Sequence, residues 1–583
     1  MAGLLPATGR PWLDQFATGS LERLLGLTRL DHAYRRLGPS ESCDEFIAKA
    51  CAALDITLHF PASELAHIPA DGPVLVVANH PFGGIEGLLL AGLLRRVRPD
   101  VRVMANYLLS RIPELAELFI AVDPFGGPRA GNAAGLRQSL RWLKQGGLLL
   151  VFPAGEVSHW QREHGAVTDP PWQEGVARLA QMAGARVLPI YLYGNNSITF
   201  HVAGLVHPRL RTALLAKELL NKRNTKVALR IGRPVEAAEI RDQAPAALIQ
   251  FLRLRTYLLG AMREELVSPP ALPELPVGEL QTVDDACARE VAALAPEQAL
   301  ASSGEFVVYL AHAAQIPALL REIGRLREQS FRQVGEGTGK DIDLDEFDVD
   351  YLHLFVWHTT KNELVGGYRL GLVDHILARR GRKGLYTRQL FRMKKKLFRQ
   401  MGAAIELGRS FVRVDYQRNF TPLLLLWKGI AAFVVRNPAY GTLFGPVSIS
   451  SAYSPVSRQL IMDFLEIVET DSELARYVRP RRKPVPERRC WGTTELATLG
   501  EIEHISRLLV DIEPDGRGVP VLLRQYLRLG GRILGFNVDE NFNDAIDALI
   551  MVDLTRCDPR TLERYMGRDA ARGFLAWHAE QKP

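Results

Sequence analysis

A histidine and a glutamate, His80 and Glu86, flank a turn-forming segment that reads Pro-Phe-Gly-Gly-Ile. A continuous helix would not align side chains six positions apart, so the turn must fold back for the carboxylate to reach the imidazole. A carboxylate on one ring nitrogen leaves the other nitrogen free as a general base for a hydroxyl. The pair predicts a site that resembles a catalytic triad, except that the hydroxyl of the substrate is the nucleophile. A glycine turn with a hydrogen-bonded histidine is the alternative.

Two apolar runs position this pair. Val74–Val77 is typical of a buried parallel strand, and Leu88–Leu94 is typical of a helix. A turn at the carboxyl end of such a strand is where open α/β sheets bind ligands. Strands expected at 102–105, 118–122 and 148–152 alternate with a helix expected from Ala133 to Gln145 with Asn132 as its cap, and this order predicts a doubly wound α/β domain.

The run Asn79-His80-Pro81-Phe82-Gly83-Gly84-Ile85-Glu86 resembles the first block of the glycerolipid (lysophospholipid) acyltransferases. That block usually has four residues between the histidine and an aspartate. Five intervening residues and a glutamate resemble the hemolysin-like and lyso-ornithine-lipid branch instead. The resemblance implies that His80 and Glu86 are catalytic and that Asn79, Gly83 and Gly84 line the substrate. Backbone amides near Gly83 and Gly84 are expected to hold the oxyanion.

Three further blocks follow in the order of that family. The second reads Val-Asp-Pro-Phe-Gly-Gly without the usual arginine, and Arg129 beside it could bind a carboxylate or phosphate. The third, residues 152–158, resembles Phe-Pro-Glu-Gly-Thr-Arg-Ser. It has alanine and valine in place of the acceptor-binding glutamate and the arginine, which disfavours a glycerol phosphate acceptor. Gly155 is expected to lie at the substrate, and Glu156 or Ser158 is expected to contact an amine or hydroxyl headgroup. Residues 187–191 resemble the fourth block of the family.

The length of the chain, 583 residues, exceeds the size at which single cores stop growing, so at least two domains are expected. Ser268–Pro276 has four prolines within nine residues and is typical of a linker. We therefore predict an O-acyltransferase-like domain at 1–265, a linker at 266–300 and a second domain at 301–583.

Composition narrows the setting. Five scattered cysteines form no metal-binding spacing, the N-terminus has no signal-peptide pattern, and no apolar run reaches the roughly 20 residues of a membrane span. We expect a cytoplasmic protein bound peripherally to the inner membrane. Residues 21–27 and the apolar helix expected after Phe420 are candidate membrane-docking segments, with a core helix as the alternative for each.

The second half predicts a different fold. A helix at 316–328, a hairpin formed by 351–357 and 364–371, a strand at 404–412, a helix after Phe420 and a strand at 443–449 resemble the acetyltransferase (GNAT) fold. The run Glu406-Leu-Gly-Arg409-Ser is similar to acyl-homoserine-lactone synthases and, more closely, to ornithine N-acyltransferases, and residues 519–539 share this likeness. The expected architecture is therefore two α/β domains, one glycerolipid-acyltransferase-like and one GNAT-like.

The acyl donor can also be inferred. GNAT enzymes that use coenzyme A hold its pyrophosphate in a glycine-containing loop, but residues 416–419 contain no glycine. An acyl carrier protein is therefore the expected donor, with acyl-coenzyme A as the alternative. The net charge is +7, and clusters at 379–383, 392–396 and 479–483 would attract an acidic carrier or an anionic membrane. Nucleic-acid binding is disfavoured because no reader motif accompanies the charge.

Acylation of an amino group needs a base for the ammonium. Glu406 is the candidate base, and Arg409 is a candidate for binding the substrate carboxylate or positioning Glu406. A structural ion pair is the alternative. Asn537 and Asp539 are weaker candidates for contacting the amino-acid headgroup, and the chemistry requires no metal and no bound cofactor.

Taken together, the resemblances imply a bifunctional ornithine-lipid synthase. The second domain would N-acylate ornithine from a 3-hydroxyacyl carrier-protein thioester, and the first would O-acylate the hydroxyl of the resulting lyso-lipid. Glycine or another small amino acid remains open as the headgroup. A phospholipid acyltransferase with an accessory second domain and a non-enzymatic membrane- or carrier-binding protein are the alternatives.

Overall fold

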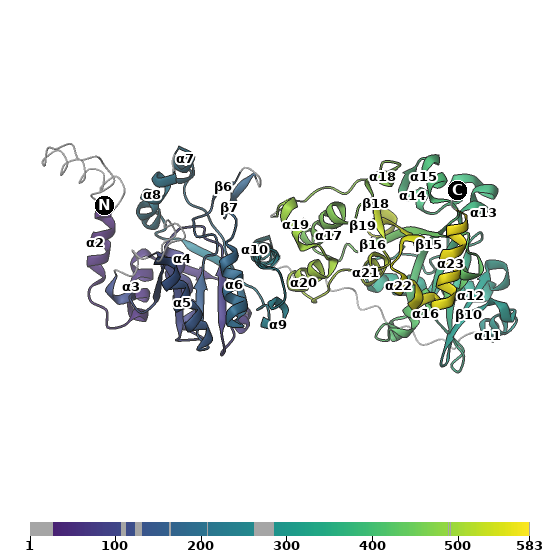
Figure 1. The fold of residues 1–583 in the computed structure, drawn as a ribbon, viewed down its shortest axis with the longest axis horizontal. Helices are drawn as coiled ribbons and strands as arrows, with labels where there is room; N and C mark the ends of the chain where they lie inside the picture. Colours follow the sequence, from purple (N-terminus) through teal and green to yellow (C-terminus); the bar gives the residue numbers. More distant parts are fainter. Residues whose placement is uncertain are drawn as a thin grey trace. The chain divides into compact units, whose positions relative to one another are not determined.

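The computed structural model describes residues 27–106, 112–122, 131–161, 165–206, 208–261, 285–487, 489 and 491–581 (Figure 1). The chain divides into two compact units. Met1–Arg263 and Arg489–Gly500 form the first, which we call the N-terminal unit; Glu264–Arg488 and Glu501–Pro583 form the second, the C-terminal unit. A short segment of the range predicted for the second domain thus belongs to the N-terminal unit.

The N-terminal unit is built on a seven-stranded sheet with the order β1-β9-β8-β2-β5-β3-β4. The central strand β2 (Val74–Ala78) is fully buried and pairs in parallel with both of its neighbours. Only the contact between β8 and β9 is antiparallel. The other strands are β1 (Thr57–His59), β3 (Val101–Asn106), β4 (Phe119–Val122), β5 (Leu148–Val151), β8 (Arg186–Leu192) and β9 (Lys226–Ile231).

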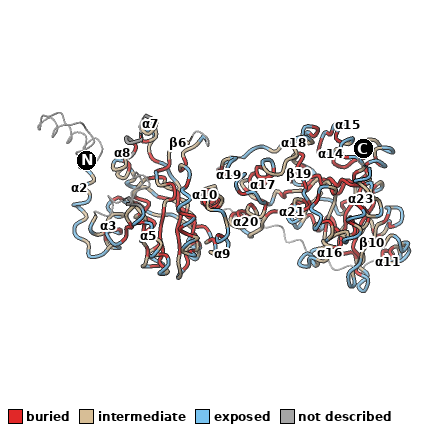
Figure 2. Tube along the Cα trace, in the orientation of Figure 1, coloured by how far each residue is buried: buried red, intermediate tan, exposed pale blue. Residues whose placement is uncertain are grey.

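Helices cover this sheet and confirm the expected α/β class. Val74, Val76 and Ala78 of β2 share one core with α3 (Cys43–Leu54) and α4 (Ile85–Arg95). Another helical layer comprises α5 (Gly131–Lys144), α6 (Glu174–Ala183) and α10 (Pro245–Ala261), and α10 packs on β8 and β2. The strands of the sheet appear as the buried interior in Figure 2. Smaller elements are α2 (Leu27–Leu37), the hairpin β6 (His159–Gln161) and β7 (Ala166–Thr168), α7 (Ile198–Val206), α8 (Pro208–Asn221), α9 (Ala237–Ile240) and α19 (Thr493–Leu499).

Helix α19 is the segment of the N-terminal unit that comes from far along the chain. It packs on α10, where Glu495 and Arg253 form an ion pair that is largely removed from solvent. Arg253 also donates to the carbonyl oxygen of Asp169 at 3.2 Å. Nothing in the sequence pattern predicts this placement, because a seven-residue amphipathic helix can pack on either domain.

The C-terminal unit contains an eight-stranded sheet with the order β10-β11-β12-β13-β15-β16-β19-β18. All neighbours pair in antiparallel fashion except β15 and β16. The predicted hairpin is confirmed as β12 (Leu352–His358) and β13 (Glu363–Leu372). The remaining strands are β10 (Ala299–Ser303), β11 (Phe306–His312), β15 (Ala404–Val412), β16 (Thr442–Ile449), β18 (Arg532–Asp539) and β19 (Ala545–Asp553), and β14 (Phe391–Met393) and β17 (Val478–Pro480) form a separate two-stranded sheet.

Two irregularities mark the middle of this sheet. The parallel ladder between β15 and β16 ends at the pair Glu406 and Phe444. Further along β15, Arg409 has a φ of +51°, and the register with β13 shifts there. A bulged residue of this kind re-aims its side chain, which places the Arg409 guanidinium beyond the end of the ladder.

One helix of this unit settles an expectation about membrane docking. The apolar helix after Phe420 is α16 (Thr421–Arg436), and it is a core helix: Leu425, Leu426 and Val434 are buried, and it packs on β11, β12 and β13. The membrane-docking alternative for this segment is therefore wrong, because its apolar face is already covered by the sheet. The other docking candidate, residues 21–27, lies almost entirely outside the described residues.

Residues 285–292 lie within the range expected to be a linker but form helix α11 (Asp285–Ala292). Cys287 and Val291 lie one turn apart and are buried against α12 (Pro317–Gln333), so this part of the chain belongs to the core of the unit. The proline-rich residues 268–276 lie outside the described residues. Other helices here are α13 (Val373–Arg380), α14 (Thr387–Leu390), α15 (Lys395–Met401), α17 (Pro455–Val468), α18 (Ser472–Ala475), α20 (Ile502–Ile512), α21 (Val521–Arg528), α22 (Pro559–Met566) and α23 (Arg568–Glu580).

None of the helices within the described ranges combines the length and the hydropathy needed to cross a bilayer.

Candidate active sites

The turn after β2 brings His80 and Glu86 together. The distance from His80 Nδ1 to Glu86 Oε1 is 2.8 Å, although the direction of this contact is not that of an aligned hydrogen bond. The imidazole stacks on Phe152 with a ring-centroid distance of 4.4 Å. Because the His80 side chain is 17% exposed while Glu86 is 0% exposed, the pair presents only the imidazole to a substrate.

Glu86 is held by the turn itself. Its Oε1 accepts from the backbone N–H groups of Phe82 at 3.0 Å and Gly83 at 2.7 Å, and its Oε2 accepts from that of Gly84 at 2.9 Å. These amides were expected to hold the oxyanion, but they donate to the buried Glu86 carboxylate and are not available to an oxyanion. Gly83 has a φ of +96°, and a Cβ there would meet Leu215 and Val157, so the turn requires glycine at this position.

The two side chains shift each other's pKa. Burial alone would raise the pKa of Glu86, but His80 and the amides of Gly83 and Gly84 lower that pKa to about 2. Burial also works against the charged imidazole, yet the Glu86 carboxylate outweighs it and raises the pKa of His80. The carboxylate therefore stabilises the imidazolium that forms when Nε2 takes a proton.

A second carboxylate, Asp169, supports the backbone of His80. Its Oδ1 accepts from the His80 backbone N–H at 3.1 Å, and its Oδ2 accepts from Trp172 Nε1 at 2.9 Å. The backbone N–H of Asp169 donates to the Tyr257 hydroxyl at 2.8 Å. Sequence reasoning missed Asp169, which is 1% exposed; the signal was an isolated acid between β7 and a buried tryptophan.

Several predicted substrate residues are structural instead. Both polar atoms of the Asn79 side chain bond the backbone of Leu192 and tie β2 to β8. Ser158 is buried, donates to Asp169 Oδ1 at 2.5 Å, and bonds the His80 carbonyl through its backbone N–H. Every polar atom of these two side chains therefore already makes a hydrogen bond within the fold.

The other predicted residues of this unit have mixed outcomes. Glu156 is half-exposed and pairs with Arg211 at 2.7 Å, so it remains able to face a ligand. Gly155 has a φ of +69°, and a Cβ there would meet Gln173, so this glycine shapes the turn after β5. Gly84 has open space where a side chain would be. Arg129 lies outside the described residues.

In the C-terminal unit, Glu406 does not fit the role of a base. It is 1% exposed, Oε1 accepts from the backbone N–H of Thr387 at 2.7 Å, and Oε2 accepts from the Tyr386 N–H at 3.2 Å and from the Tyr351 hydroxyl. Burial raises the pKa of this carboxyl. With both oxygens in use inside the core, Glu406 fixes the start of α14 on β15 and cannot reach a substrate amine.

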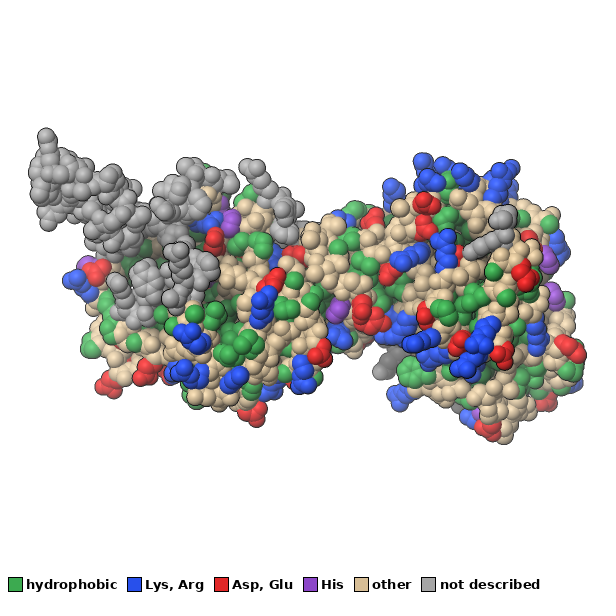
Figure 3. Space-filling view, viewed as in Figure 1, with side chains coloured by type: hydrophobic (Ala, Val, Ile, Leu, Met, Phe, Trp, Pro, Cys, Tyr) green, Lys and Arg blue, Asp and Glu red, His purple; other side chains and the backbone are tan. Residues whose placement is uncertain are grey.

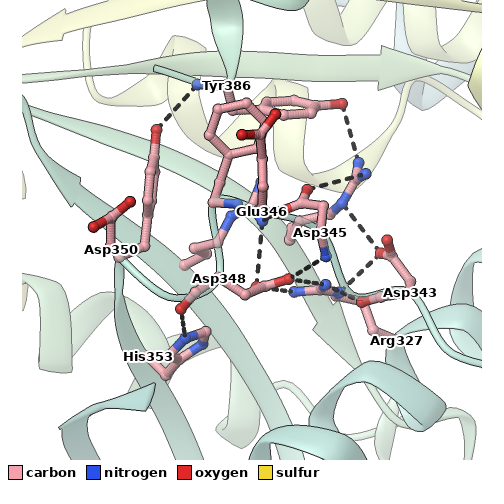
Figure 4. A network of polar contacts seen from close by, with 12 residues as sticks. Arg327, Asp343, Asp345, Glu346, Asp348, Asp350, His353 and Tyr386 are labelled. Atoms are coloured by element: carbon pink, nitrogen blue, oxygen red, sulfur yellow. Dashed lines mark hydrogen bonds and ion pairs between the residues drawn. The ribbon is translucent and has the colours of Figure 1, made fainter. Parts of the chain in front are cut away.

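Beside it lies a buried ion network (Figure 4). Arg327 contacts Asp343 at 2.8 Å and both oxygens of Asp348 at 3.1 and 3.2 Å, and it lies between these two aspartates in the figure. Arg369 contacts Asp345 at 2.5 Å and Asp348 at 3.2 Å. Burial alone would raise the pKa of Asp348, but Arg369 and Arg327 lower it. Asp343 and Asp348 are thus ion-pair partners in the core.

We expect Arg327→Met to destabilise the C-terminal unit by about 3–5 kcal/mol, because it takes from the buried Asp343 and Asp348 one of the two arginines that each contacts. Denaturant unfolding followed by circular dichroism measures this. As a control, Arg528→Met breaks an exposed pair with Glu503 and should cost no more than about 1 kcal/mol. Because the folded pKa of Asp348 is depressed, the stability it contributes is present above its ordinary pKa and is lost as the pH falls. Equal losses for the two variants would contradict the assignment.

Arg409 belongs to the same network. Its Nε lies 3.1 Å from Asp343, Nη1 donates to the Tyr386 hydroxyl at 3.1 Å, and Nη2 is 3.9 Å from Asp345. Among the interactions of the described residues it has none with Glu406, so it does not position that residue. Because 3.9 Å is too long for a hydrogen bond, Nη2 keeps donors for an incoming carboxylate.

Three buried carboxyl groups lie near Arg409: Glu336, Asp539 and Asp547, of which only Asp539 was expected at the site. We call these three the carboxyl group cluster. Burial raises the pKa of each, that of Glu336 to about 7 and that of Asp547 well above its ordinary range. Glu336 accepts from the hydroxyl of Ser448 at 2.7 Å, and Asp547 lies directly across the sheet from Ser448. A carboxyl group titrating near neutral pH is suited to act as a general base.

The two residues of β18 that were expected at the headgroup have different surroundings. Asn537 is buried, its Oδ1 accepts from the Arg482 N–H at 2.9 Å and its Nδ2 donates to the Val538 carbonyl, so it is structural. Asp539 accepts from the Asn541 N–H at 3.0 Å and stays within the carboxyl group cluster. Among the described residues, no set of histidine, cysteine and carboxylate side chains is arranged to hold a metal ion.

Comparison with known proteins follows the two units. Residues 12–264 match a family described as acyltransferase, and residues 326–428 match the acetyltransferase (GNAT) domain. Glycine N(alpha)-acyltransferase of Bacteroides thetaiotaomicron is 31% identical over 262 residues, which are 42% of this chain and 76% of that protein. Lyso-glycine lipid O-acyltransferase of Phocaeicola vulgatus is 26% identical over 231 residues, 38% of this chain and 76% of that protein. The 1-acyl-sn-glycerophosphate acyltransferase PlsC of Thermotoga maritima aligns at a TM-score of 0.25 and 21% identity over 41% of this chain and 84% of that one, too loosely to inform the fold.

Proposed function

We propose that this chain, which belongs to the acyltransferases and combines an acyltransferase domain with an acetyltransferase (GNAT) domain, makes an amino-acid lipid by two successive acyl transfers. One observation carries the proposal: the single chain is similar both to an N-acyltransferase and to a lyso-lipid O-acyltransferase, which in the relatives are separate proteins. Fusion would keep a poorly soluble intermediate at high effective concentration near the second site.

The first transfer belongs to the C-terminal unit. Glu336 takes a proton from the ammonium of the amino acid, and the free amine attacks the thioester carbonyl of the donor. The C–N bond forms, the C–S bond breaks, and the thiol leaves with a proton. Arg409, through Nη2, binds the carboxylate of the amino acid.

The second transfer belongs to the N-terminal unit. His80 Nε2 removes the proton of the 3-hydroxyl group of the lyso-lipid, and the alkoxide attacks the carbonyl of a second acyl thioester. Glu86 stabilises the imidazolium, and Asp169 keeps the backbone of His80 in place. The imidazolium then protonates the leaving thiolate, which returns His80 to its neutral form.

Two headgroups have support. Ornithine is favoured by the carboxyl group cluster, because a second ammonium group would have a carboxylate partner besides the base; Asp547 Oδ2 has no hydrogen-bond partner within the described residues. Glycine is favoured by the relatives, whose names specify glycine for those proteins. We propose that the headgroup is ornithine and that an acyl carrier protein is the acyl donor.

The lyso-lipid acceptor also implies work at a membrane surface. Two exposed apolar side chains, Ile198 and Val202, lie one turn apart on α7, and Trp160 is exposed on β6, against which α7 packs. Such a surface can enter the headgroup region of a bilayer without spanning it. The proposed location is the cytoplasmic face of the inner membrane.

The test is lipid mass spectrometry in a bacterial host that lacks amino-acid lipids and expresses the full chain. We expect a new diacylated lipid whose headgroup mass is that of ornithine. A glycine headgroup would keep the two-step function and overturn the ornithine assignment. A rise in phosphatidic acid with no amino-acid lipid would overturn the function and indicate an ordinary glycerolipid acyltransferase.

A further inference from the structure

Six cationic side chains surround a surface depression of about 530 Å³ in the C-terminal unit. Figure 3 shows lysine and arginine side chains gathered on this part of the unit, over α14 and α15. Met393 and Tyr477 complete the lining. The six are Arg382, Arg388, Arg392, Lys394, Arg479 and Arg481.

The small sheet of β14 and β17 holds part of the set in place. Phe391, Met393 and Val478 point into the core, so the alternate residues Arg392 and Arg479 face outward. These two arginines are directly opposite each other in the antiparallel ladder. Like charges at such positions destabilise a sheet, and an anion between them removes that cost.

None of the six has a carboxylate partner in the described part of the chain, and Glu540 pairs with the adjacent Arg482 instead. Arg382, Arg388 and Arg481 each donate instead to a backbone carbonyl, at 3.0, 3.3 and 2.8 Å, which orients the guanidinium groups while leaving other N–H donors free. Burial, followed by the neighbouring Arg382 and Arg481, lowers the pKa of Arg388, as expected where cations crowd without counter-ions.

The depression is joined to the candidate N-acylation site through the backbone. Arg388 belongs to α14, whose first residue, Thr387, is bonded to Glu406, and the preceding Tyr386 accepts from Arg409. On the other wall, Arg481 precedes Arg482, whose N–H bonds Asn537 of β18. An anion bound here therefore lies against the two segments that frame the site.

We propose that this depression binds a phosphate ester carried by the acyl donor. Arginine forks match phosphate oxygens in pairs, and several guanidinium groups around one depression suit a group with more than one negative charge. The inference rests on the proposed function for the identity of the donor. The same phosphate chemistry is available from the pantetheine arm of an acyl carrier protein and from coenzyme A.

The test compares Arg388→Gln, Arg479→Gln and Arg481→Gln with Arg399→Gln, an exposed arginine of α15 outside the depression. N-acylation is measured with acyl carrier protein and with acyl-coenzyme A as donors, at low and high salt. Each depression variant should raise the donor KM about three- to tenfold, more than it lowers kcat, and should weaken the salt dependence. Arg399→Gln should change neither. The donor that shows the effect identifies the source of the phosphate.

A second measurement separates the two hypotheses. Titration of the full chain with inorganic pyrophosphate should give one binding event that Arg388→Gln and Arg481→Gln weaken. Pyrophosphate binding without N-acylation of any amino acid would support the phosphate site and overturn the proposed function. Unchanged donor KM values and unchanged pyrophosphate binding in all three variants would overturn the phosphate site. If the three variants lose only the binding of the chain to anionic phospholipid vesicles, the phosphate site is also overturned, and the depression is a membrane contact instead.

Discussion

The variant His80→Ala is expected to lower O-acylation by a factor of about 10²–10⁴, because it removes the general base from the site. The fold should survive, since the imidazole is partly exposed and the backbone contacts of His80 with Asp169 and Ser158 do not involve its side chain. In a host that makes the complete lipid with the wild-type chain, the variant should accumulate the mono-acylated amino-acid lipid. Mass spectrometry of extracted lipids measures the ratio of the two products.

The control is His32→Ala, an exposed histidine of α2 in the same unit, which should leave the product ratio unchanged. Diacylated lipid from His80→Ala at the wild-type level would show that His80 is not the base. Loss of both lipids would indicate that the substitution also harms the C-terminal unit or the abundance of the chain, which an immunoblot distinguishes.

The pH dependence of O-acylation gives an independent check. Because Glu86 raises the pKa of His80 and the base must be neutral, the rate falls as the pH drops through that raised pKa. Glu86→Gln removes the carboxylate, so the acid limb should move to lower pH while the maximal rate falls, since the imidazolium loses its partner. An acid limb that does not move would contradict the pairing of the two side chains during the reaction.

For the N-terminal unit, the contact between His80 and Glu86 could be predicted because both residues flank one short turn. The use of the Gly83 and Gly84 amides could not. A sequence shows where a turn can form, but not whether its N–H groups face a ligand or a side chain of the same turn. Asn79 and Ser158 were misplaced for a related reason, since their side chains bond strands that are distant in the sequence.

For the C-terminal unit, the order of helices and strands could be predicted from the sequence, but the residues of the site could not. Glu406 stood in a motif-like run, but burial removed it from the chemistry. Glu336 and Asp547 are distant in the sequence and come together only through the register of β16 and β19. One signal was present: Asp547 is a lone acid inside the apolar run of β19, where an uncompensated carboxyl is costly and calls for a reason.

The second large effect concerns Glu336. Glu336→Gln should lower N-acylation by a factor of about 10²–10⁴, because the amide keeps the shape of the side chain and its contact with Ser448 but cannot take a proton. The wild-type rate should rise as the pH passes through about 7, the pKa of Glu336, and then level off. The variant should lack this limb. Purified protein, ornithine and an acyl carrier-protein thioester provide the assay, with release of the carrier thiol as the readout.

Stability separates this loss of activity from loss of fold. The folded pKa of Glu336 lies above that of an ordinary carboxyl, so the protonated group stabilises the fold at low pH, and this stability is lost as the pH rises through about 7. A permanently neutral glutamine does not have that loss, so Glu336→Gln should unfold at no lower denaturant concentration than wild type above pH 7. The exposed Glu466→Gln of α17 is the matched control and should leave both rate and stability unchanged. If Glu336→Gln keeps the wild-type rate and pH profile, the base must be sought at Asp547, the other carboxyl group of the cluster whose pKa is strongly raised.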